Sequence, residues 1–288
     1  MNDTIPDILA AFDTFDGTYK RNEVDAALAL QEEITPHLIA ILEKVLSDPT
    51  AHARKPDYFG HIYAIELLGH FQEPRAHDVI VDLASLPPEV PHDLFGDVIT
   101  EDLAAIMFGT CGGSIERIVE LLLNREADQY CRSAASRALV YAVIEDTVPR
   151  KNVLALFGSL FSGDEAAPDS DFWGFLAISV CNLYPEELMD VIKKGFEDGV
   201  ISDWIIDLAF FEETLRRGRE QALNKVRGNL RRDAPADFHD RMSWWACFKQ
   251  GTRVSRPPTR PAKKRSKPKK AGKKRQRHRP PRKKKKRR

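Results

Sequence analysis

The sequence predicts an all-α protein, a HEAT-like α-solenoid of five to six helical hairpins followed by a disordered polycationic C-terminal tail. The first observation behind this prediction is an apolar stripe at helical spacing that recurs along the chain, with leading positions at Leu38, Ala76, Ile115, Val153 and Leu188. The intervals are 38, 39, 38 and 35 residues, and a period near forty is typical of HEAT-like hairpins. An irregular helical bundle with chance spacing is the alternative.

A helix-breaking residue shortly before each stripe is the second observation. The breakers are Pro36, Pro74, the pair Gly112 and Gly113, Pro149 and Pro185. Proline has no amide hydrogen to donate, and glycine ends helices readily. Each breaker therefore predicts the turn between the two helices of a hairpin.

Residues 58–86 show the expected hairpin most clearly. The first half, 58–71, is apolar on nearly every side, which predicts a helix packed between neighbours. The second half is one-sided, so we expect Leu83 in the core and Asp82 in solvent. Pro87 and Pro88 end it.

The remaining elements follow in chain order. We expect a capping helix over 5–15 and hairpins over 22–46, 97–123, 128–161 and 172–196, with a more basic last pair over 203–231. Residues 162–170 are predicted to form a mobile acidic loop. Residues 237–248 contain Trp244, Trp245 and Phe248, and we interpret them as a lid over the exposed end of the array, because an open end would expose core.

Charge divides the chain into two parts, which is the third observation. Residues 1–250 contain 23 Lys or Arg and 43 Asp or Glu, whereas residues 251–288 contain 21 Lys or Arg and no acidic residue. The sequence therefore predicts an acidic solenoid over 1–250, with a net charge of −20, joined to a basic tail over 251–288.

Several protein classes are not expected from this composition. The four cysteines show no C-x-x-C spacing, so neither a disulfide framework nor a zinc knuckle is predicted. No signal peptide and no apolar stretch long enough to span a membrane is present, which predicts a cytoplasmic protein. No nucleotide-binding or hydrolase motif occurs, and we expect a protein that is not an enzyme and has no metal or other cofactor.

The basic tail is the strongest functional signal. Its composition cannot bury a core, so we expect it to be disordered and to contact phosphates without reading sequence. The candidate nucleic-acid-binding residues are Lys263, Lys264, Arg265, Lys267, Lys269, Lys270, Lys273, Lys274, Arg275, Arg277, Arg279, Arg282, Lys283, Lys284, Lys285, Lys286, Arg287 and Arg288. A merely solubilising tail and binding to a membrane surface are the alternatives.

An acidic cluster, Asp97, Glu101 and Asp102, is the first candidate site within the solenoid. With His61 and Glu66 it would form a metal or acid–base site, but helix capping also favours acidic residues at a helix start. We interpret the cluster as capping, and otherwise as a partner-binding surface.

Two further segments carry candidate residues. Trp244 and Trp245 are candidates for partner binding, although adjacent aromatics on a terminal helix are more often core. Cys111, followed by two glycines, resembles a reactive-cysteine loop, but a turn between helices needs glycine anyway.

Five segments also carry a resemblance to a known family: Glu33-Ile-Thr-Pro-His-Leu38, Tyr58-Phe-Gly-His-Ile-Tyr-Ala64, Gly96-Asp-Val-Ile-Thr-Glu-Asp-Leu103, Leu183-Tyr-Pro-Glu-Glu-Leu188 and Trp244-Trp-Ala-Cys-Phe248. Over nearly all of residues 1–248 the chain resembles a bacterial helical-repeat family of unknown function. Many members end in a short Cys-rich SecA-type zinc motif, whereas here a basic segment without cysteine follows Phe248. The resemblance implies a fold and no activity.

Together these observations predict a non-enzymatic binding protein. The acidic solenoid would hold a protein partner while the basic tail tethers it to DNA or RNA, with the nucleoid or the ribosome as possible locations. The alternative is a protein-only adaptor whose tail binds acidic protein surfaces, including its own body.

Overall fold

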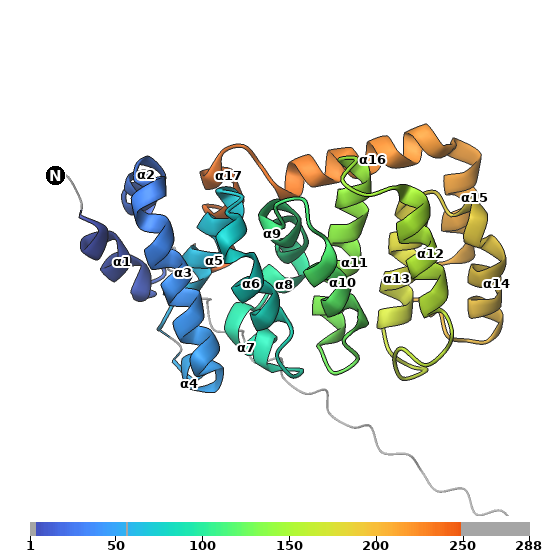
Figure 1. Cartoon of the computed structure of the whole chain (residues 1–288), viewed down its shortest axis with the longest axis horizontal. Coiled ribbons are helices and arrows are strands. Elements are labelled where there is room, and N and C mark those ends of the chain that lie inside the picture. The colour runs from blue at the N-terminus through green and yellow to red at the C-terminus, as the bar shows by residue number, and fades with distance from the viewer. Residues whose placement is uncertain (1–3, 56, 249–288) are drawn as a thin grey trace, which may run out of the picture. The chain divides into compact units, whose positions relative to one another are not determined.

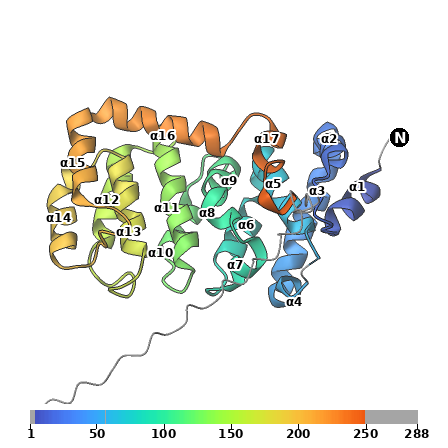
Figure 2. The same cartoon turned by 180° about the vertical axis from the view of Figure 1, so that it is seen from behind.

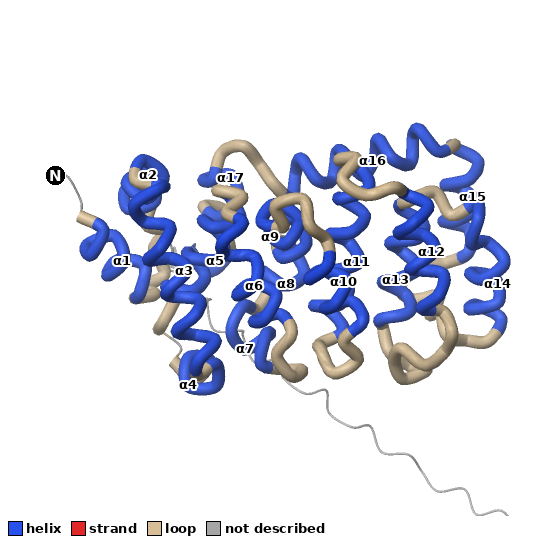
Figure 3. The backbone as a smooth tube through the Cα atoms, in the orientation of Figure 1, coloured by secondary structure: helices blue, strands red, loops and turns tan. Residues whose placement is uncertain are grey.

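The computed structural model describes residues 4–55 and 57–248, and the regular elements in this part are all helices (Figures 1 and 3). The all-α prediction is confirmed there. No described helix is both long and apolar enough to cross a membrane. The predicted disordered tail lies outside the described residues.

The described helices form hairpins in chain order within one compact unit. The first helices of the hairpins are α2 (Arg21–Ala29), α5 (Gly60–His70), α9 (Leu103–Thr110), α11 (Gln129–Ile144), α13 (Phe172–Asn182) and α15 (Leu208–Arg217). The second helices are α3 (Gln31–Ser47), α6 (His77–Ala84), α10 (Glu116–Leu123), α12 (Arg150–Leu160), α14 (Met189–Glu197) and α16 (Arg219–Asp233). The elements outside the hairpin helices are α1 (Ile5–Asp13), α4 (Pro49–Ala53), η1 (Pro74–Ala76), α7 (Val90–Phe95), α8 (Val98–Glu101), η2 (Glu186–Leu188) and α17 (Phe238–Met242).

The first helices form the centre of the packing. Helix α5 contacts α3 and α9, and α11 contacts α9, α10 and α13, so neighbouring hairpins share one continuous core. All of α5 is buried except His70, as its apolar composition predicts. Leu83 is fully buried, whereas the side chain of Asp82 is 47% exposed and pairs with Arg117, which confirms the predicted facing of α6.

Four of the five predicted breaks coincide with turns, Pro185 among them at the N-cap of η2, whereas Pro36 does not. Pro74 begins η1, Pro149 precedes α12, and Gly112 and Gly113 adopt positive φ angles of 59° and 89° after α9. Pro36 lies inside α3, so the predicted break at this residue was wrong. Pro36 and Glu32, one turn earlier, are both exposed, so the ring and the carbonyl that it leaves unbonded face solvent.

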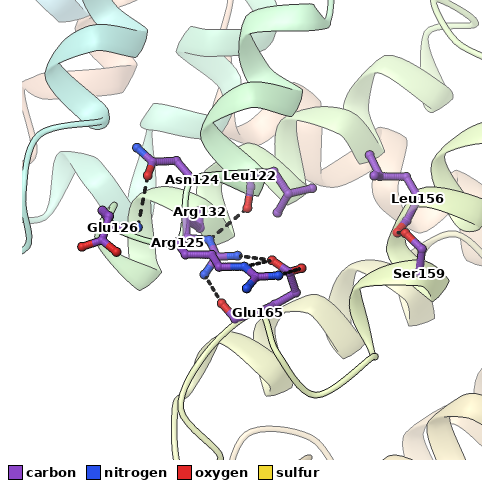
Figure 4. A network of polar contacts seen from close by, with 8 residues as sticks. All are labelled: Leu122, Asn124, Arg125, Glu126, Arg132, Leu156, Ser159 and Glu165. Atoms are coloured by element: carbon purple, nitrogen blue, oxygen red, sulfur yellow. Dashed lines mark hydrogen bonds and ion pairs between the residues drawn. The ribbon is translucent and has the colours of Figure 1, made fainter.

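Ion pairs attach Glu165 of the loop 162–170 to Arg125 and Arg132 (Figure 4), and the mobility of this loop stays a prediction. Arg132 is 2% exposed and donates to Leu122 O at 2.9 Å and to Glu165 O at 2.8 Å. Arg125 donates to Glu165 Oε1 at 2.9 Å. A buried guanidinium that bonds backbone carbonyls on two hairpins fixes their spacing. We expect this contact to hold α10 and α11 to the loop that connects α12 and α13.

The chain folds back after α15, which the sequence did not predict. Helix α16 packs on α15, α13 and α11, and α17 lies beside α5 (Figures 1 and 2). The interpretation of 237–248 as a lid on the last repeat was therefore wrong. At 15 residues, α16 spans about 22 Å, which carries the chain back across two hairpins. We call residues 219–248, which contain α16 and α17, the return segment.

Candidate functional site on the first-helix face

The return segment lies against the first helices of the hairpins: α16 packs on α11, α13 and α15 along the upper edge of the array, and α17 lies beside α5 (Figures 1 and 2). We call the side of the array that these first helices form the first-helix face. Helix α16 of the return segment covers parts of α11, α13 and α15, the end of the segment lies against α5, and hollows remain beside α16 between α8 and α15. Both the predicted partner-binding residues and the hollows lie on this face.

Apolar and aromatic side chains attach the end of the return segment to the first helices. Phe238 is 1% exposed and packs edge-on against His70, with ring centroids 5.3 Å apart, and Met242 is fully buried. The ring centroid of Phe248 lies 5.4 Å from that of Tyr19 and 5.9 Å from that of Phe59. Although α17 has only five residues, these contacts bury the side of it that faces α5.

A buried charge cluster completes the attachment. Arg241 Nε lies 2.5 Å from Glu66 Oε2 and 3.6 Å from Asp102 Oδ1, so one guanidinium faces carboxylates from α5 and from the junction of α8 and α9. The side chains of Arg241 and Glu66 are 3% and 0% exposed. The close contact is poorly aligned for a hydrogen bond, and neither Glu66 oxygen has a hydrogen-bond partner among the described residues. The cluster is therefore held mainly by charge.

The single positive charge of Arg241 cannot neutralise both carboxyl groups if Glu66 and Asp102 are both ionised. Burial raises the pKa of Glu66 to about 8 despite the attraction of Arg241, and the charge on Asp102 raises it further. Burial likewise raises the pKa of Asp102 to about 6, with Arg241 opposing. Near neutral pH the carboxyl pair therefore retains a proton, and its titration belongs to the pair rather than to either residue.

His239 links the return segment to the first hairpin. Its Nε2 lies 2.9 Å from Asp25 Oδ1, and its Nδ1 lies 2.8 Å from the hydroxyl of Tyr19. When Nε2 carries the proton it donates to Asp25, and Nδ1 then accepts from Tyr19. Residues more than 200 positions apart in the sequence are joined in this way.

The residues proposed from the sequence as partner-binding differ in their exposure. Asp102 is buried in the charge cluster, whereas Asp97 and Glu101 are exposed. Asp97 occupies the N-cap position of α8, but its side chain makes no capping hydrogen bond. Trp244 is 58% exposed, and Trp245 is half-buried and stacks on Phe248. The two groups belong to one region, because Arg241 lies three positions before Trp244 and contacts Asp102.

Sequence reasoning missed Arg241. Its helix is too short to show a period, and its partner Glu66 is 175 positions away. The available signal was Glu66 itself, because a carboxylate inside a helix that is apolar all round requires a cationic partner.

The other candidate residues, His61 and Cys111, are buried parts of the helical packing. His61 Nε2 donates to Leu94 O at 2.6 Å, and burial lowers the pKa of His61 to about 4, so the ring is neutral near pH 7. Cys111 is buried after α9, and all four cysteines are free. Within the described residues no group of three or more His, Cys, Asp or Glu side chains is arranged to hold a metal ion.

Two hollows lie on the first-helix face, one of them against α16. One, of about 280 Å³, is lined by Ile99, Thr100, Tyr130, Ser133, Ala134, Arg137, Phe175, Ile178, Ser179 and Asn182. The next, of about 200 Å³, is lined by Ile178, Cys181, Asn182, Ile205, Ile206, Phe210, Thr214, Ala222 and Lys225. Ile178 and Asn182 line both, so the two hollows adjoin each other. We call them together the α8–α15 groove.

The groove combines apolar walls with a few charged side chains of both signs nearby. Arg137 and Lys225 line it, and an adjoining hollow of about 530 Å³, which shares Phe210 and Lys225, is also lined by Asp207, Glu213 and Arg217. Arg137 Nη2 donates to Thr100 O at 2.8 Å, and Lys225 Nζ lies 5.8 Å from the centre of the Phe210 ring. Phe210 is 56% exposed, and Trp204, next to the groove residue Ile205, is 97% exposed. Exposed aromatics beside a hollow are typical of protein-binding surfaces.

Comparison with known proteins gives a family but no activity. The family described as "Protein of unknown function (DUF1186)" matches residues 3–249, which include the return segment and end before the basic tail. An uncharacterized protein of Chlamydia trachomatis serovar D is 34% identical over 192 residues, covering 67% of this chain and 76% of the relative. An uncharacterized protein of Chlamydia muridarum is 34% identical over 192 residues, covering 67% and 77%. No solved structure matches.

Proposed function

The chain belongs to the DUF1186 family of proteins of unknown function, and from this premise we propose that it is a non-enzymatic binding protein. Its acidic body holds a protein partner, and its basic tail tethers it to DNA or RNA without sequence preference. The family agrees with the helical-repeat family that the sequence resembles.

The separation of charge carries this proposal. Residues 251–288 contain 21 basic and no acidic residues, whereas residues 1–250 have a net charge of −20. A cationic chain binds nucleic acid by releasing the counterions condensed on the phosphates, which needs no folded surface. No aromatic residue lies within the tail, which argues against base stacking and for contact with the backbone alone.

The body supports the protein-binding half of the proposal. The α8–α15 groove is open, apolar in its walls and flanked by exposed Phe210 and Trp204. Glu66, whose raised pKa would suit a general acid, is fully buried and lines neither hollow of the groove. The groove therefore favours binding over chemistry.

A second candidate function follows from the acidity of the body. Residues 251–288 carry 21 cations and residues 1–250 carry a net charge of −20. Because opposite charges attract, the tail would bind acidic protein surfaces, and the body of the same chain is one such surface. In this candidate the tail binds acidic protein surfaces, its own body included, and the chain is a protein-only adaptor.

A mobility-shift assay separates the two functions. We expect the full chain to shift duplex DNA and structured RNA at low salt, and residues 1–250 to shift neither. If about half of the basic residues meet phosphates, log K against log salt falls with a slope of about −9 on duplex DNA. As a control, residues 1–250 should melt within a few degrees of the full chain, because every described helix lies in them. A shift that survives removal of the tail would contradict the tether.

A further inference from the structure

We propose that the outward side of α16 is a second contact for the nucleic acid that the basic tail binds, and that it contacts the phosphate backbone. The inference rests on the proposed function, because it adds a contact within the folded body to the tether. Three observations carry it: the concentration of cations on α16, their arrangement around an exposed glycine, and the burial of the apolar residues of this helix.

Basic residues are concentrated at α16, which lies along the upper edge of the array (Figures 1 and 2). Residues 216–232 contain seven of the 23 basic residues of 1–250 and only one acidic residue, although the body as a whole is acidic. Clustering of Lys and Arg along one helix is the pattern expected of a nucleic-acid-binding surface.

Acidic side chains lie close to four of these seven cations. The first three pair with glutamates of α15 and η2; they are Arg216, Arg217 and Arg219. The fourth, Lys225, lies beside the hollow that Asp207 and Glu213 also line. The seven cations are therefore not equally available to a ligand.

The remaining three cations lie near the end of the helix. They are Arg227, Arg231 and Arg232, which we call the α16 basic face. Arg227 and Arg231 make no ion pair with any described residue. Arg232 Nε lies 3.5 Å from Asp233 Oδ1, but its side chain is 72% exposed, and an ion pair this exposed contributes little. The positive charge of this face is thus left for a ligand.

An exposed glycine lies within the α16 basic face. Arg231 and Arg232 are three and four positions after Gly228, so the three residues share one side of the helix. A Cβ at Gly228 would meet no neighbouring atom within 4 Å, so packing does not explain the glycine. Glycine inside a helix is destabilising relative to alanine, but it lets a ligand approach the backbone closely. The space beside the two arginines is open to a phosphate.

The helix dipole accounts for only part of the α16 basic face. It favours cations within the last turn, where Arg231 and Arg232 lie, but Arg227 precedes that turn. Arg227 donates to Asn224 Oδ1 at 2.8 Å. Arg232 donates to Asn229 Oδ1 at 3.2 Å. Neutral amides orient these guanidinium groups and leave their charge uncompensated, so a phosphate can pair with them.

A protein partner and a membrane fit this side of α16 less well. The apolar residues Ala222 and Val226 are buried, because α16 packs on α11, α13 and α15. Protein interfaces are centred on aromatic or apolar anchors, and a helix that lies on a membrane needs a free apolar side. Contacts to phosphates need only cations and polar donors, which the outward side of α16 supplies.

The α16 basic face acts together with the tail. Counterion release grows with the number of phosphates neutralised, and about three contacts release too few ions to hold a duplex alone. We therefore still expect residues 1–250 to give no mobility shift. In the full chain the tail raises the effective concentration of nucleic acid at α16, because both belong to one chain.

The experiment measures the affinity of the full chain for one labelled duplex across a salt series. The test variant is Arg227→Gln/Arg231→Gln/Arg232→Gln, and the control variant is Lys55→Gln/Lys151→Gln/Lys193→Gln. The control removes the same charge from exposed lysines outside α16. Gly228→Glu is a second test variant, because it places a carboxylate within the face at an exposed position where the added side chain meets open space.

We expect the triple test variant to bind the duplex roughly tenfold more weakly than the control variant at low salt. Its plot of log K against log salt should be less steep by about 2.7, from about 0.9 for each of three lost phosphate contacts. Gly228→Glu should weaken binding in the same direction. The melting temperatures of all variants should match that of the unaltered chain, since the altered residues are at the surface.

Equal affinities of the test and control variants would overturn the α16 contact and leave the tether intact. Unchanged duplex binding, with lost binding to vesicles that contain phosphatidylserine, would assign the α16 basic face to a membrane surface instead. An unaltered chain that binds no duplex at low salt would contradict the tether and, with it, the α16 contact.

Discussion

Replacing Arg241 with Met should lower the melting temperature at pH 8 by about 10 °C. Removing one partner of a buried ion pair typically costs about 3–5 kcal/mol, because the remaining charges lose their compensation. For a domain of this size each kcal/mol corresponds to about 2–4 °C. Here Glu66 and Asp102 lose Arg241, the buried cation that faces both carboxyl groups. We expect the end of the return segment to detach, and circular-dichroism melting with limited proteolysis would measure both effects.

Two further variants make this prediction specific. Arg231→Met changes an exposed arginine of α16 and should leave the melting temperature nearly unchanged. The double variant Glu66→Leu/Arg241→Met removes both members of the closest ion pair and should recover most of the loss, since apolar replacements of buried ion pairs are often neutral. An Arg241→Met variant that melts like the unaltered chain would show that charge does not hold the return segment.

Stability should fall as pH rises from about 6.5 to about 8.5, by about 2 kcal/mol. The pKa of Glu66 is raised above its unfolded value by burial, so the folded state binds the proton more tightly. Its stabilising contribution is complete below the unfolded pKa and is lost as pH rises toward about 8. Burial lowers the pKa of His61 and of His70, which faces the cluster, so both histidines make stability rise with pH, but only below about pH 6.5.

The Glu66→Gln variant is the control for this pH dependence. A neutral amide of similar shape removes the titration, and Arg241 still faces Asp102. Denaturant unfolding at several pH values should therefore give a flatter profile for Glu66→Gln than for the unaltered chain. Parallel profiles would mean that another group causes the slope.

The repeat architecture could be predicted because it depends on local signals. The stripe that ends at Leu83 and the turn at Gly112 and Gly113 are encoded within a few residues, and the structure confirms both. The break predicted at Pro36 was wrong, because this proline lies on the exposed side of α3 and removes only one backbone hydrogen bond of the helix.

The candidate site could be predicted only in part, because contacts across many repeats decide it. Glu66, Asp102 and Trp244 were identified from the sequence, but nothing local indicates that Arg241 joins the first two. The α8–α15 groove was missed altogether. Its cationic residues Arg137 and Lys225 lie on α11 and α16, and only the reversal of the chain after α15 brings them to the same groove.

We propose that the acidic body and the nucleic-acid-binding tail act on each other within one chain. With random-coil statistics, the 38 residues of the tail would span about 35 Å, which corresponds to an effective concentration of about 1 mM at the body surface. The acidic body should then compete with nucleic acid for the tail. A partner that covers the acidic surface would release the tail for nucleic acid.

The most direct test compares the affinities of the isolated 251–288 peptide and of the full chain for one labelled duplex across a salt series. We predict that the peptide binds more tightly at low salt and that the difference narrows as salt rises, because added ions screen both attractions. Equal affinities throughout the series would contradict competition by the body. A peptide that fails to bind the duplex at low salt would contradict the tether itself.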